Sequence, residues 1–399
     1  MRHQKELPPT WLVIALLALP QVAETILAPA LPDIARVWNL ESAQTQWVMG
    51  IFFLGFAIGV FVWGRVADQW GRRPAMLGGL TVALLGTVAA AHAPSYTAML
   101  AGRCVQAVGL ATCSVTTQTI LRDRLNGDAL IRYFVTLGIV LAWSPAVGPL
   151  SGQLLSDWHG YRAVLWLVVA ILSLLLLSGL QYLPETHGNA GLNVSTRKLA
   201  MRMLGDQAIW RSAVLVASLN TLMFSFYAAG PFMVGHLPGP GFGWVGLAVA
   251  LVSSLGAAFN HRLHAGVTSA RRVQYGLASV LGGVILQLIL VLVTGRAGIL
   301  WAIAALPVFV GLGLAIPNIL GSALRDYGDC PGRAGALFGV AYYTMLGAAI
   351  ATSAMLPFDT PVPLSTFWLG ITALLFLAHG NERKTRADRT RTCKLNNGG

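Results

Sequence analysis

The sequence predicts an all-α membrane protein with twelve transmembrane helices, and three observations support this fold class. Only 11% of the 399 residues are charged and 55% are hydrophobic, whereas about 25% of the residues of a soluble domain are charged. Apolar stretches of about 20 residues, enough to cross a bilayer as a helix, recur along the whole chain. Lysine and arginine collect in alternate connections between these stretches, as they do in multi-spanning proteins.

Proline, glycine and clusters of charge interrupt the apolar stretches and mark the ends of the predicted helices. The predicted spans are residues 11–31, 45–65, 75–93, 97–121, 132–155, 162–183, 209–231, 242–262, 272–294, 297–322, 334–356 and 362–380. The first span is too long for the core of a signal peptide and lacks a clear cleavage site. We therefore expect it to be retained, with a cleaved signal as the alternative.

The basic residues predict the orientation. With the N-terminus inside, 23 of the 27 lysines and arginines lie in inner segments, three lie in outer segments and Arg103 lies within a span. One missed span would invert every later connection and destroy this bias. We expect both termini to be cytoplasmic, in the inner membrane of a bacterium. The inner-face excess explains the net charge of +12, so this charge does not indicate a nucleic-acid partner.

A polar, basic connection over residues 184–208 divides the chain into two halves of six spans each. We expect two six-helix bundles, residues 1–183 and 209–380, with a binding site between them near the middle of the membrane. Residues 381–399 form a basic tail that we expect to be disordered and cytoplasmic, where it could lie on anionic lipid.

The polar stretch Gly64-Arg65-Val66-Ala67-Asp68-Gln69-Trp70-Gly71-Arg72-Arg73-Pro74 predicts a tight inner loop between spans 2 and 3. It resembles the G-x-x-x-D-x-x-G-R-R loop signature of the major facilitator superfamily. That resemblance implies that Asp68 and Arg72 hold the two bundles together when the cavity opens outward. The predicted gate residues are Gly64, Asp68, Gly71, Arg72, Arg73, Arg122 and Asp123. A charged turn that only fixes the topology is the alternative.

Two further stretches of the N-terminal half are similar to superfamily motifs. Residues 103–109 resemble the R-x-x-Q-G pattern, with two residues between Gln106 and Gly109. Residues 144–152 resemble the G-P-x-x-G motif of drug/proton antiporters. The residues of this motif that would bend the helix and allow close packing are Pro145, Gly148, Pro149 and Gly152. A packing face of small residues is the alternative.

Other stretches resemble the bicyclomycin/chloramphenicol-resistance (Bcr/CflA) branch of the superfamily. They are residues 29–32 (P-A-L-P), 161–166, 230–232, 260–262, 317–318 and 333–337. The branch usually has an Asp four residues before the first proline of P-A-L-P. Here Thr25 occupies that position and the carboxylate is Glu24, one residue earlier. This shift turns the side chain by about 100° on a helix.

Proton-coupled transport needs a titratable group within the membrane, where such a group is costly and therefore functional by default. Of the 15 carboxylates, only Glu24 lies well inside a predicted span, so Glu24 is the predicted proton acceptor. A Glu that is only structurally paired is the alternative.

Arg103 is the expected neighbour of Glu24, because both residues lie roughly 10 Å below the predicted outer face at about 1.5 Å per residue. A pair formed directly, through Gln106 or through water would set the pKa of the carboxylate. Alternatively, Arg103 only extends to the outer interface.

The predicted pocket is apolar with a few polar groups. Spacings of four and three place Asn220, Phe224 and Tyr227 on one helix face. The full set of candidate cavity residues is Gln106, Gln118, Asn220, Phe224, Tyr227, Asn318, Tyr342 and Tyr343. Each could instead be a core or lipid-facing residue.

Nucleotide-driven and metal-dependent mechanisms have no support in the sequence. No G-x-x-x-x-G-K-[ST] loop is present, and the four cysteines fit neither a disulfide framework nor a metal site. We expect no enzyme, no cofactor and no metal, and the proton gradient as the energy source. The predicted protein is a monomeric antiporter that exports small drug-like compounds, with substrate, protons and lipid as its partners. A dedicated transporter of one metabolite (nucleoside, peptide or siderophore) is the alternative, and a multi-pass lipid-modifying enzyme is a distant one.

Overall fold

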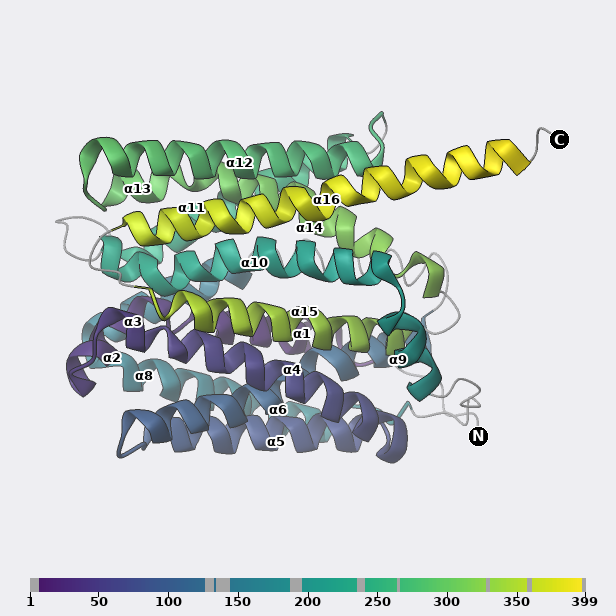
Figure 1. The fold of residues 1–399 in the computed structure, drawn as a ribbon. Helices are drawn as coiled ribbons and strands as arrows, with labels where there is room; N and C mark the ends of the chain where they lie inside the picture. Colours follow the sequence, from purple (N-terminus) through teal and green to yellow (C-terminus); the bar gives the residue numbers. More distant parts are fainter. Residues whose placement is uncertain are drawn as a thin grey trace, which may run out of the picture.

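The computed structural model describes residues 7–125, 133, 144–186, 196–234, 241–263, 266–327, 331–356 and 361–396. Within these residues every regular element is a helix (Figure 1). Eleven of the described segments are long and apolar enough to cross a membrane. One of them, α8 (Ser144–Tyr182), merges two helices at Gly160 and so contains parts of two predicted spans. The predicted span 132–155 otherwise begins outside the described residues, apart from Tyr133.

The N-terminal half is built from the following elements: α1 (Thr10–Thr25), η1 (Ala28–Ala30), α2 (Leu31–Trp38), α3 (Ser42–Thr45), α4 (Trp47–Trp70), α5 (Arg72–Ala91), α6 (Tyr96–Arg124) and α8. Asp33 fixes the joint within α8, because its carboxylate accepts a hydrogen bond of 2.7 Å from the backbone N–H of Tyr161. Gly160, with φ +74°, leaves space there: an added Cβ would come within 2.9 Å of that carboxylate.

The C-terminal half follows a short helix of the connecting segment, α9 (Thr196–Leu204). Its elements are α10 (Gln207–Val234), α11 (Phe242–Leu263), α12 (Ser269–Thr294), α13 (Ile299–Ala304), α14 (Leu306–Ala323), η2 (Arg325–Tyr327), α15 (Pro331–Ser353) and α16 (Val362–Asn396). Phe226 lies at the centre of this bundle, 5.1 Å between ring centroids from both Trp301 and Phe309. Trp368 of α16 donates a hydrogen bond to Ser225, so the last helix is fastened to α10.

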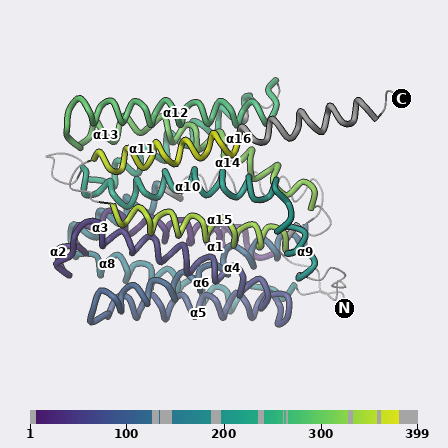
Figure 2. The backbone as a smooth tube through the Cα atoms, viewed as in Figure 1, coloured from purple at the N-terminus to yellow at the C-terminus, as the bar shows by residue number. Residues whose placement is uncertain are grey.

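The two halves lie side by side, with α10 and α15 next to the N-terminal half (Figure 2). Trp11 at the start of α1 contacts Tyr182 at the end of α8, with 6.1 Å between ring centroids. The N-terminal half therefore begins and ends at the same end of its bundle, as an even number of crossings requires.

Two boundaries differ from the prediction. The predicted loop of residues 64–74 is almost entirely helical, because α4 continues to Trp70, α5 begins at Arg72 and only Gly71 (φ +102°) lies between them. The last helix also continues beyond residue 380, where the sequence predicts a disordered tail, and its backbone is helical to Asn396. No proline follows Pro363 and many of the later residues favour helix.

Helices α4 and α15 form a long antiparallel contact between the bundles. The facing pairs are Gly50 with Ala351, Leu54 with Gly347, Phe56 with Tyr343, Val60 with Gly339, Gly64 with Ala336 and Asp68 with Arg333. Glycine recurs in this seam because a missing side chain lets two helices approach closely. At the end away from Asp68, the Ser353 hydroxyl lies 3.4 Å from the Gln46 side-chain oxygen.

Candidate functional site

Glu24 lies near the end of α1 at the interface between the bundles. Its residue surface is only 6% exposed, and it makes no hydrogen bond or ion pair with any residue that the structure describes. Its charge interacts with Arg103 of the same bundle and with Tyr342 and Tyr343 of α15 in the other bundle. The only carboxylate predicted well inside a span is thus buried between groups from both halves.

The neighbouring Thr25, in the position of the branch's usual Asp, has a different environment. Its hydroxyl hydrogen bonds to carbonyls of its own helix, those of Gln21 and Val22. On the other side it faces Gly148 of α8, where an added Cβ would overlap the Thr25 oxygen. The one-residue shift of the carboxylate therefore leaves a small residue packed against α8.

Arg103 of α6 is fully buried, so it does not extend to an interface. Its guanidinium donates to the Gln106 side-chain oxygen and, at 3.4 Å, to the Ala23 carbonyl oxygen. It also lies over the ring of Phe52, 4.6 Å from the ring centroid. Arg103 and Glu24 form no ion pair within 4.0 Å, so in this conformation Gln106 is bound by Arg103 and the two charges interact at longer range.

Aromatic side chains from both bundles surround these groups. The set, called here the central aromatic residues, consists of Phe52, Phe53 and Phe56 of α4, Phe224 and Tyr227 of α10, and Tyr342 and Tyr343 of α15. Ring centroids are 4.4 Å apart for Phe53 and Phe224 and 4.7 Å apart for Phe56 and Tyr343. Both contacts cross from one bundle to the other.

Three buried polar atoms near these rings have no hydrogen-bond partner: Arg103 Nε, Gln106 Nε2 and the Tyr227 hydroxyl. Burying an unsatisfied polar group costs free energy, so each of these atoms would gain from a ligand that hydrogen bonds to it. Together with Glu24, they supply both donors and an acceptor beside a large aromatic surface. This composition suits a small molecule with an apolar body and a few polar groups.

The predicted cavity residues divide into two groups. Gln106, Phe224, Tyr227, Tyr342 and Tyr343 lie in this central region, as their contacts show.

The other three predicted residues have local partners. Gln118 bonds to Ser114 and Asn220 to the Val216 carbonyl, each on its own helix. Asn318 donates to the Asn260 side chain at 2.6 Å, and Asn260 accepts from Arg272 at 2.9 Å. The structure thus places Asn318 in a packing network within the C-terminal bundle, away from Glu24.

The residues of the predicted helix-bend motif lie between α1 and α11. Gly152 packs against the Ile26 carbonyl of α1, and Pro149 lies against Gly246 of α11. The side chain of Pro145 lies outside the described part of the chain. The non-helical residue within α8 is Gly160, so in the described part the motif supports close packing more than a bend.

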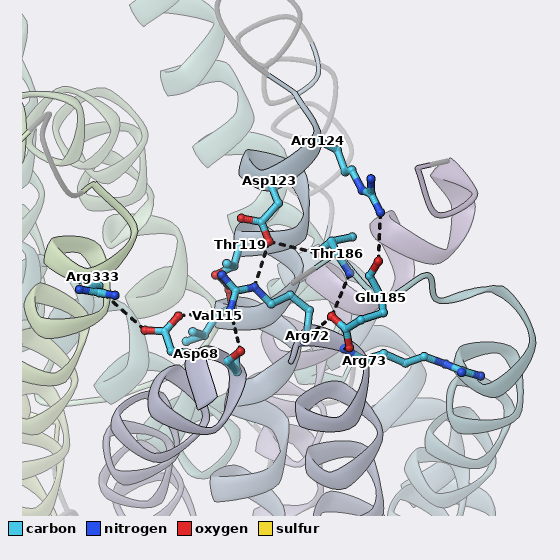
Figure 3. Close-up of polar contacts among 11 residues, drawn as sticks. Asp68, Arg72, Arg73, Val115, Thr119, Asp123, Arg124, Glu185, Thr186 and Arg333 are labelled. Carbon is cyan, nitrogen blue, oxygen red and sulfur yellow. Dashed lines mark hydrogen bonds and ion pairs between the residues drawn. The ribbon is translucent and has the colours of Figure 1, made fainter. Parts of the chain in front are cut away.

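Three of the predicted gate residues, Asp68, Arg72 and Asp123, form a group with Arg333 that we call the charged cluster (Figure 3). Arg72 donates to the Asp123 carboxylate at 2.9 Å, to the Ala67 carbonyl at 2.6 Å and to the Asp68 carboxylate at 3.3 Å. Only 12% of the Arg72 side chain is exposed, so these interactions are partly shielded from water. The cluster joins the ends of α4, α5 and α6.

Arg333 connects this cluster to the other bundle. It belongs to α15, and its Nε atom lies 3.5 Å from the second carboxylate oxygen of Asp68 (Figure 3). We call the end of the bundles that carries the cluster the charged end. One turn away, a Cβ added at Gly64 would lie 4.0 Å from the Ala336 Cβ. Arg122, which the sequence also assigns to the gate, makes no hydrogen bond or ion pair with a described residue.

Sequence reasoning missed three residues here: Arg333, which belongs to the cluster, and Glu185 and Thr186, which bind it. The Glu185 carboxylate accepts from the backbone N–H groups of Arg72 at 2.9 Å and Arg73 at 3.2 Å, and Thr186 donates to Asp123 at 3.0 Å (Figure 3). One signal was present in the sequence: α5 begins after Gly71, which has no side chain to cap the helix.

Known proteins give an independent view of the chain. The sequence model of the Major Facilitator Superfamily matches residues 13–354. An uncharacterized transporter of Rickettsia bellii is 28% identical over 387 residues, covering 92% of this chain and 93% of that protein. Multidrug resistance protein D of Escherichia coli is 25% identical over 361 residues, covering 90% and 91%.

Among solved structures, a POT family transporter in complex with a thioalcohol-conjugated peptide superposes with a TM-score of 0.77 at 10% identity, covering 95% of this chain and 96% of the other. At that identity the likeness supports the fold alone. The family model covers far more than half of the sequence. The chain therefore belongs to the Major Facilitator Superfamily and is a multi-pass membrane transporter, not an enzyme.

Proposed function

We propose that this transporter exports small, partly apolar, drug-like compounds in exchange for protons, with Glu24 as the proton acceptor. The observation that carries the proposal is the position of Glu24. It is a buried carboxylate without a hydrogen-bond partner, set between the bundles beside Arg103 and the central aromatic residues. Multidrug resistance protein D is a relative over nearly the whole chain, which favours drug-like substrates.

The coupling follows from electrostatics at this site. A protonated, neutral Glu24 suits an apolar environment, whereas an ionised Glu24 needs a counter-charge or a polar ligand. Arg103 supplies that counter-charge when it turns from Gln106 toward the carboxylate. A substrate with a donor group can do the same, so proton and substrate bind Glu24 alternately and antiport results.

The charged cluster serves as the inner gate in this proposal. Its end carries the basic connections, and the positive-charge bias assigns such an end to the cytoplasm of a bacterial inner membrane. In this proposal the N- and C-termini are both cytoplasmic. The Asp68–Arg333 contact, which crosses between the bundles, opens when the site faces inward.

The test uses inside-out vesicles that hold a proton gradient, acid inside. Chloramphenicol-like compounds and lipophilic cations are added, and the dissipation of the gradient is followed for wild type and Glu24→Gln. Glu41→Gln is a matched control, because Glu41 lies at the exposed start of α3, away from the central site. Drug-dependent dissipation in wild type and Glu41→Gln that Glu24→Gln abolishes is the expected result.

Two outcomes would contradict the proposal. Dissipation that survives in Glu24→Gln would show that another residue carries the proton. The absence of a response to every drug, with protein present in the vesicles, would favour the dedicated metabolite transporter and would be followed with nucleosides, peptides and siderophores.

A further inference from the structure

Glu185, at the start of the connecting segment, occupies an unusual position. Its carboxylate binds the N-terminus of a helix that lies 113 residues earlier in the chain, with both oxygens engaged by the N–H groups of Arg72 and Arg73. The first turn of a helix has N–H groups without intrahelical partners and favours a negative charge. Because Gly71 precedes the helix, no local side chain supplies that cap.

The geometry of Gly71 is matched to this contact. Its φ of +102° is a backbone conformation that suits glycine. A Cβ built on Gly71 would come within 2.5 Å of a Glu185 carboxylate oxygen. The second glycine of the loop signature therefore has two effects: it allows α4 and α5 to meet at one residue, and it leaves room for a carboxylate from another segment.

Arg72 links this cap to the charged cluster. Its backbone N–H binds Glu185, while its guanidinium binds Asp68, Asp123 and the Ala67 carbonyl. The Arg72 side chain is long and reaches three acceptors at once. Because Glu185 holds the Arg72 backbone in place, the side chain starts from a fixed position. Asp68 can then present its other oxygen to Arg333.

Further hydrogen bonds around Glu185 and Thr186 lie within the same bundle. Thr186 donates to Asp123, Arg124 donates to the Glu185 carbonyl at 3.0 Å, and Arg73 donates to the Leu180 carbonyl at 2.7 Å. All these partners belong to α5, α6 or the end of α8. The Asp68–Arg333 contact, in contrast, joins the two bundles.

We propose that Glu185 is a positioning residue of the gate. It holds the start of α5 so that Arg72 and Asp68 lie within reach of Arg333. The hydrogen bonds from the Arg72 and Arg73 N–H groups to Glu185, which we call the Glu185 cap, persist when the Asp68–Arg333 contact opens. The start of the connecting segment is thereby anchored to the N-terminal bundle throughout the transport cycle, whereas α9 also contacts the C-terminal half, where Arg202 donates to the Asp326 carbonyl at 2.7 Å. The inference goes beyond the proposed function, because it requires neither proton coupling nor a particular substrate.

The first test measures opening at the charged end. The four cysteines are replaced by serine, and spin labels are attached at Gln69 of α4 and Arg262 of α11. Double electron–electron resonance then measures the distance between the labels, and so between the bundles. Both positions are exposed. Glu185→Ala is expected to raise the population of long distances about tenfold, the change that 1.4 kcal/mol produces, and Glu185→Gln, which keeps an acceptor oxygen, to raise it less.

The control variant is Asp326→Asn. Asp326 is an exposed carboxylate on the other bundle, and its side chain makes no hydrogen bond within the described residues. The distribution of Gln69–Arg262 distances in Asp326→Asn is expected to match that of wild type. The proposal is overturned if folded Glu185→Ala, checked by its melting temperature, gives the wild-type distribution, or if Asp326→Asn gives the same shift. Where Glu185→Ala does not fold, Glu185→Gln carries the same comparison.

The second test asks whether the hydrogen bonds between Glu185 and the start of α5 persist when the gate opens. Labels at Trp70 and Tyr182, both exposed, report the distance between the end of α4 and the end of α8 within one bundle. In Arg333→Gln, which removes the charged partner of Asp68 on the other bundle, the Gln69–Arg262 distance is expected to lengthen while the Trp70–Tyr182 distance stays unchanged. A Trp70–Tyr182 distance that lengthens together with the gate would contradict a permanent anchor.

Discussion

Asp68 of α4 and Arg333 of α15 are joined across the two bundles at 3.5 Å, and their side chains are 32% and 22% exposed. Partly exposed ion pairs contribute about 0.2–1 kcal/mol. Arg72, in contrast, is held by three acceptors within one bundle. The contact that must break on opening is therefore the weaker part of the charged cluster.

Removing that contact should favour opening at the charged end. With a single cysteine at Ala336, Arg333→Gln is expected to increase the rate of alkylation by a membrane-impermeant maleimide about two- to fivefold, the change that corresponds to such an ion pair. Arg325→Gln is the control, since Arg325 is an exposed cation near the same end with no described hydrogen bond. Equal rates in wild type and Arg333→Gln would show that the pair does not hold the bundles.

The seam between α4 and α15 predicts a contrast between two glycines. At Gly347 an added Cβ would lie 2.8 Å from the Leu54 side chain and 3.1 Å from its backbone nitrogen, whereas at Gly370 of α16 nothing lies within 4 Å. Gly347→Ala is expected to cost about 1–3 kcal/mol through overpacking. Gly370→Ala should be neutral or stabilise by up to about 1 kcal/mol.

Thermal unfolding in detergent measures both glycine variants. The prediction requires a lower melting temperature for Gly347→Ala than for Gly370→Ala. The reverse order would mean that the bundles are not in close contact along this seam.

The Tyr227 hydroxyl is buried without a partner, so its removal should not destabilise the protein. Tyr227→Phe is expected to leave the melting temperature unchanged or slightly higher. If the hydroxyl binds substrate, the same variant should raise the KM of a transported compound about fivefold, because a hydrogen bond between neutral groups, worth roughly 1 kcal/mol, is lost.

Tyr327→Phe is the matched comparison for that variant. The Tyr327 hydroxyl donates to Asp206 at 2.9 Å at the charged end. Its loss is expected to lower the melting temperature, since a partner is left unsatisfied, and to leave KM unchanged. If Tyr227→Phe destabilised the protein more than Tyr327→Phe, the assignment of a free hydroxyl at the central site would be wrong.

Asp33 offers a test of the joint within α8. Its carboxylate caps the second part of that helix at Tyr161, so Asp33→Ala is expected to cost about 0.5–2 kcal/mol of stability. Asp157→Ala, which removes only an exposed contact with Gln153, should cost less. Melting temperatures of the two variants in the same detergent decide the order.

Much of the fold could be predicted because membrane-spanning helices are long, apolar and separated by charge. The family and the helical class are confirmed, and most predicted spans agree with helices such as α5 and α12 to within a few residues. The orientation of the termini stays a prediction. The helical ends of α4 and α5 were missed, because a charged, glycine-containing stretch resembles a loop although only Gly71 leaves the helical conformation.

The central site was predictable where a residue was chemically out of place. Glu24 and Arg103 are the charged residues within apolar spans, and both are buried, Glu24 between the bundles and Arg103 within the N-terminal bundle. Phe53 and Phe56 were not foreseen, since α4 is apolar on every side and no periodicity identifies the face toward α15. Glu185 could not be identified either, because the glycine at Gly71 indicates only that the helix start needs a partner, and a contact over 113 residues leaves no pattern that identifies that partner.

The seam between α4 and α15 also sets how far the bundles must tilt. Phe56 and Tyr343 meet near its middle, and Asp68 lies twelve residues further along α4. At 1.5 Å per residue this is a lever arm of about 18 Å. A rotation of about 10° around the aromatic contact moves the end of that arm by about 3 Å, enough to separate Asp68 from Arg333. The aromatic contact that would hold a substrate is thus also the point around which the bundles rotate. The size of a molecule bound there therefore directly affects the angle between the bundles.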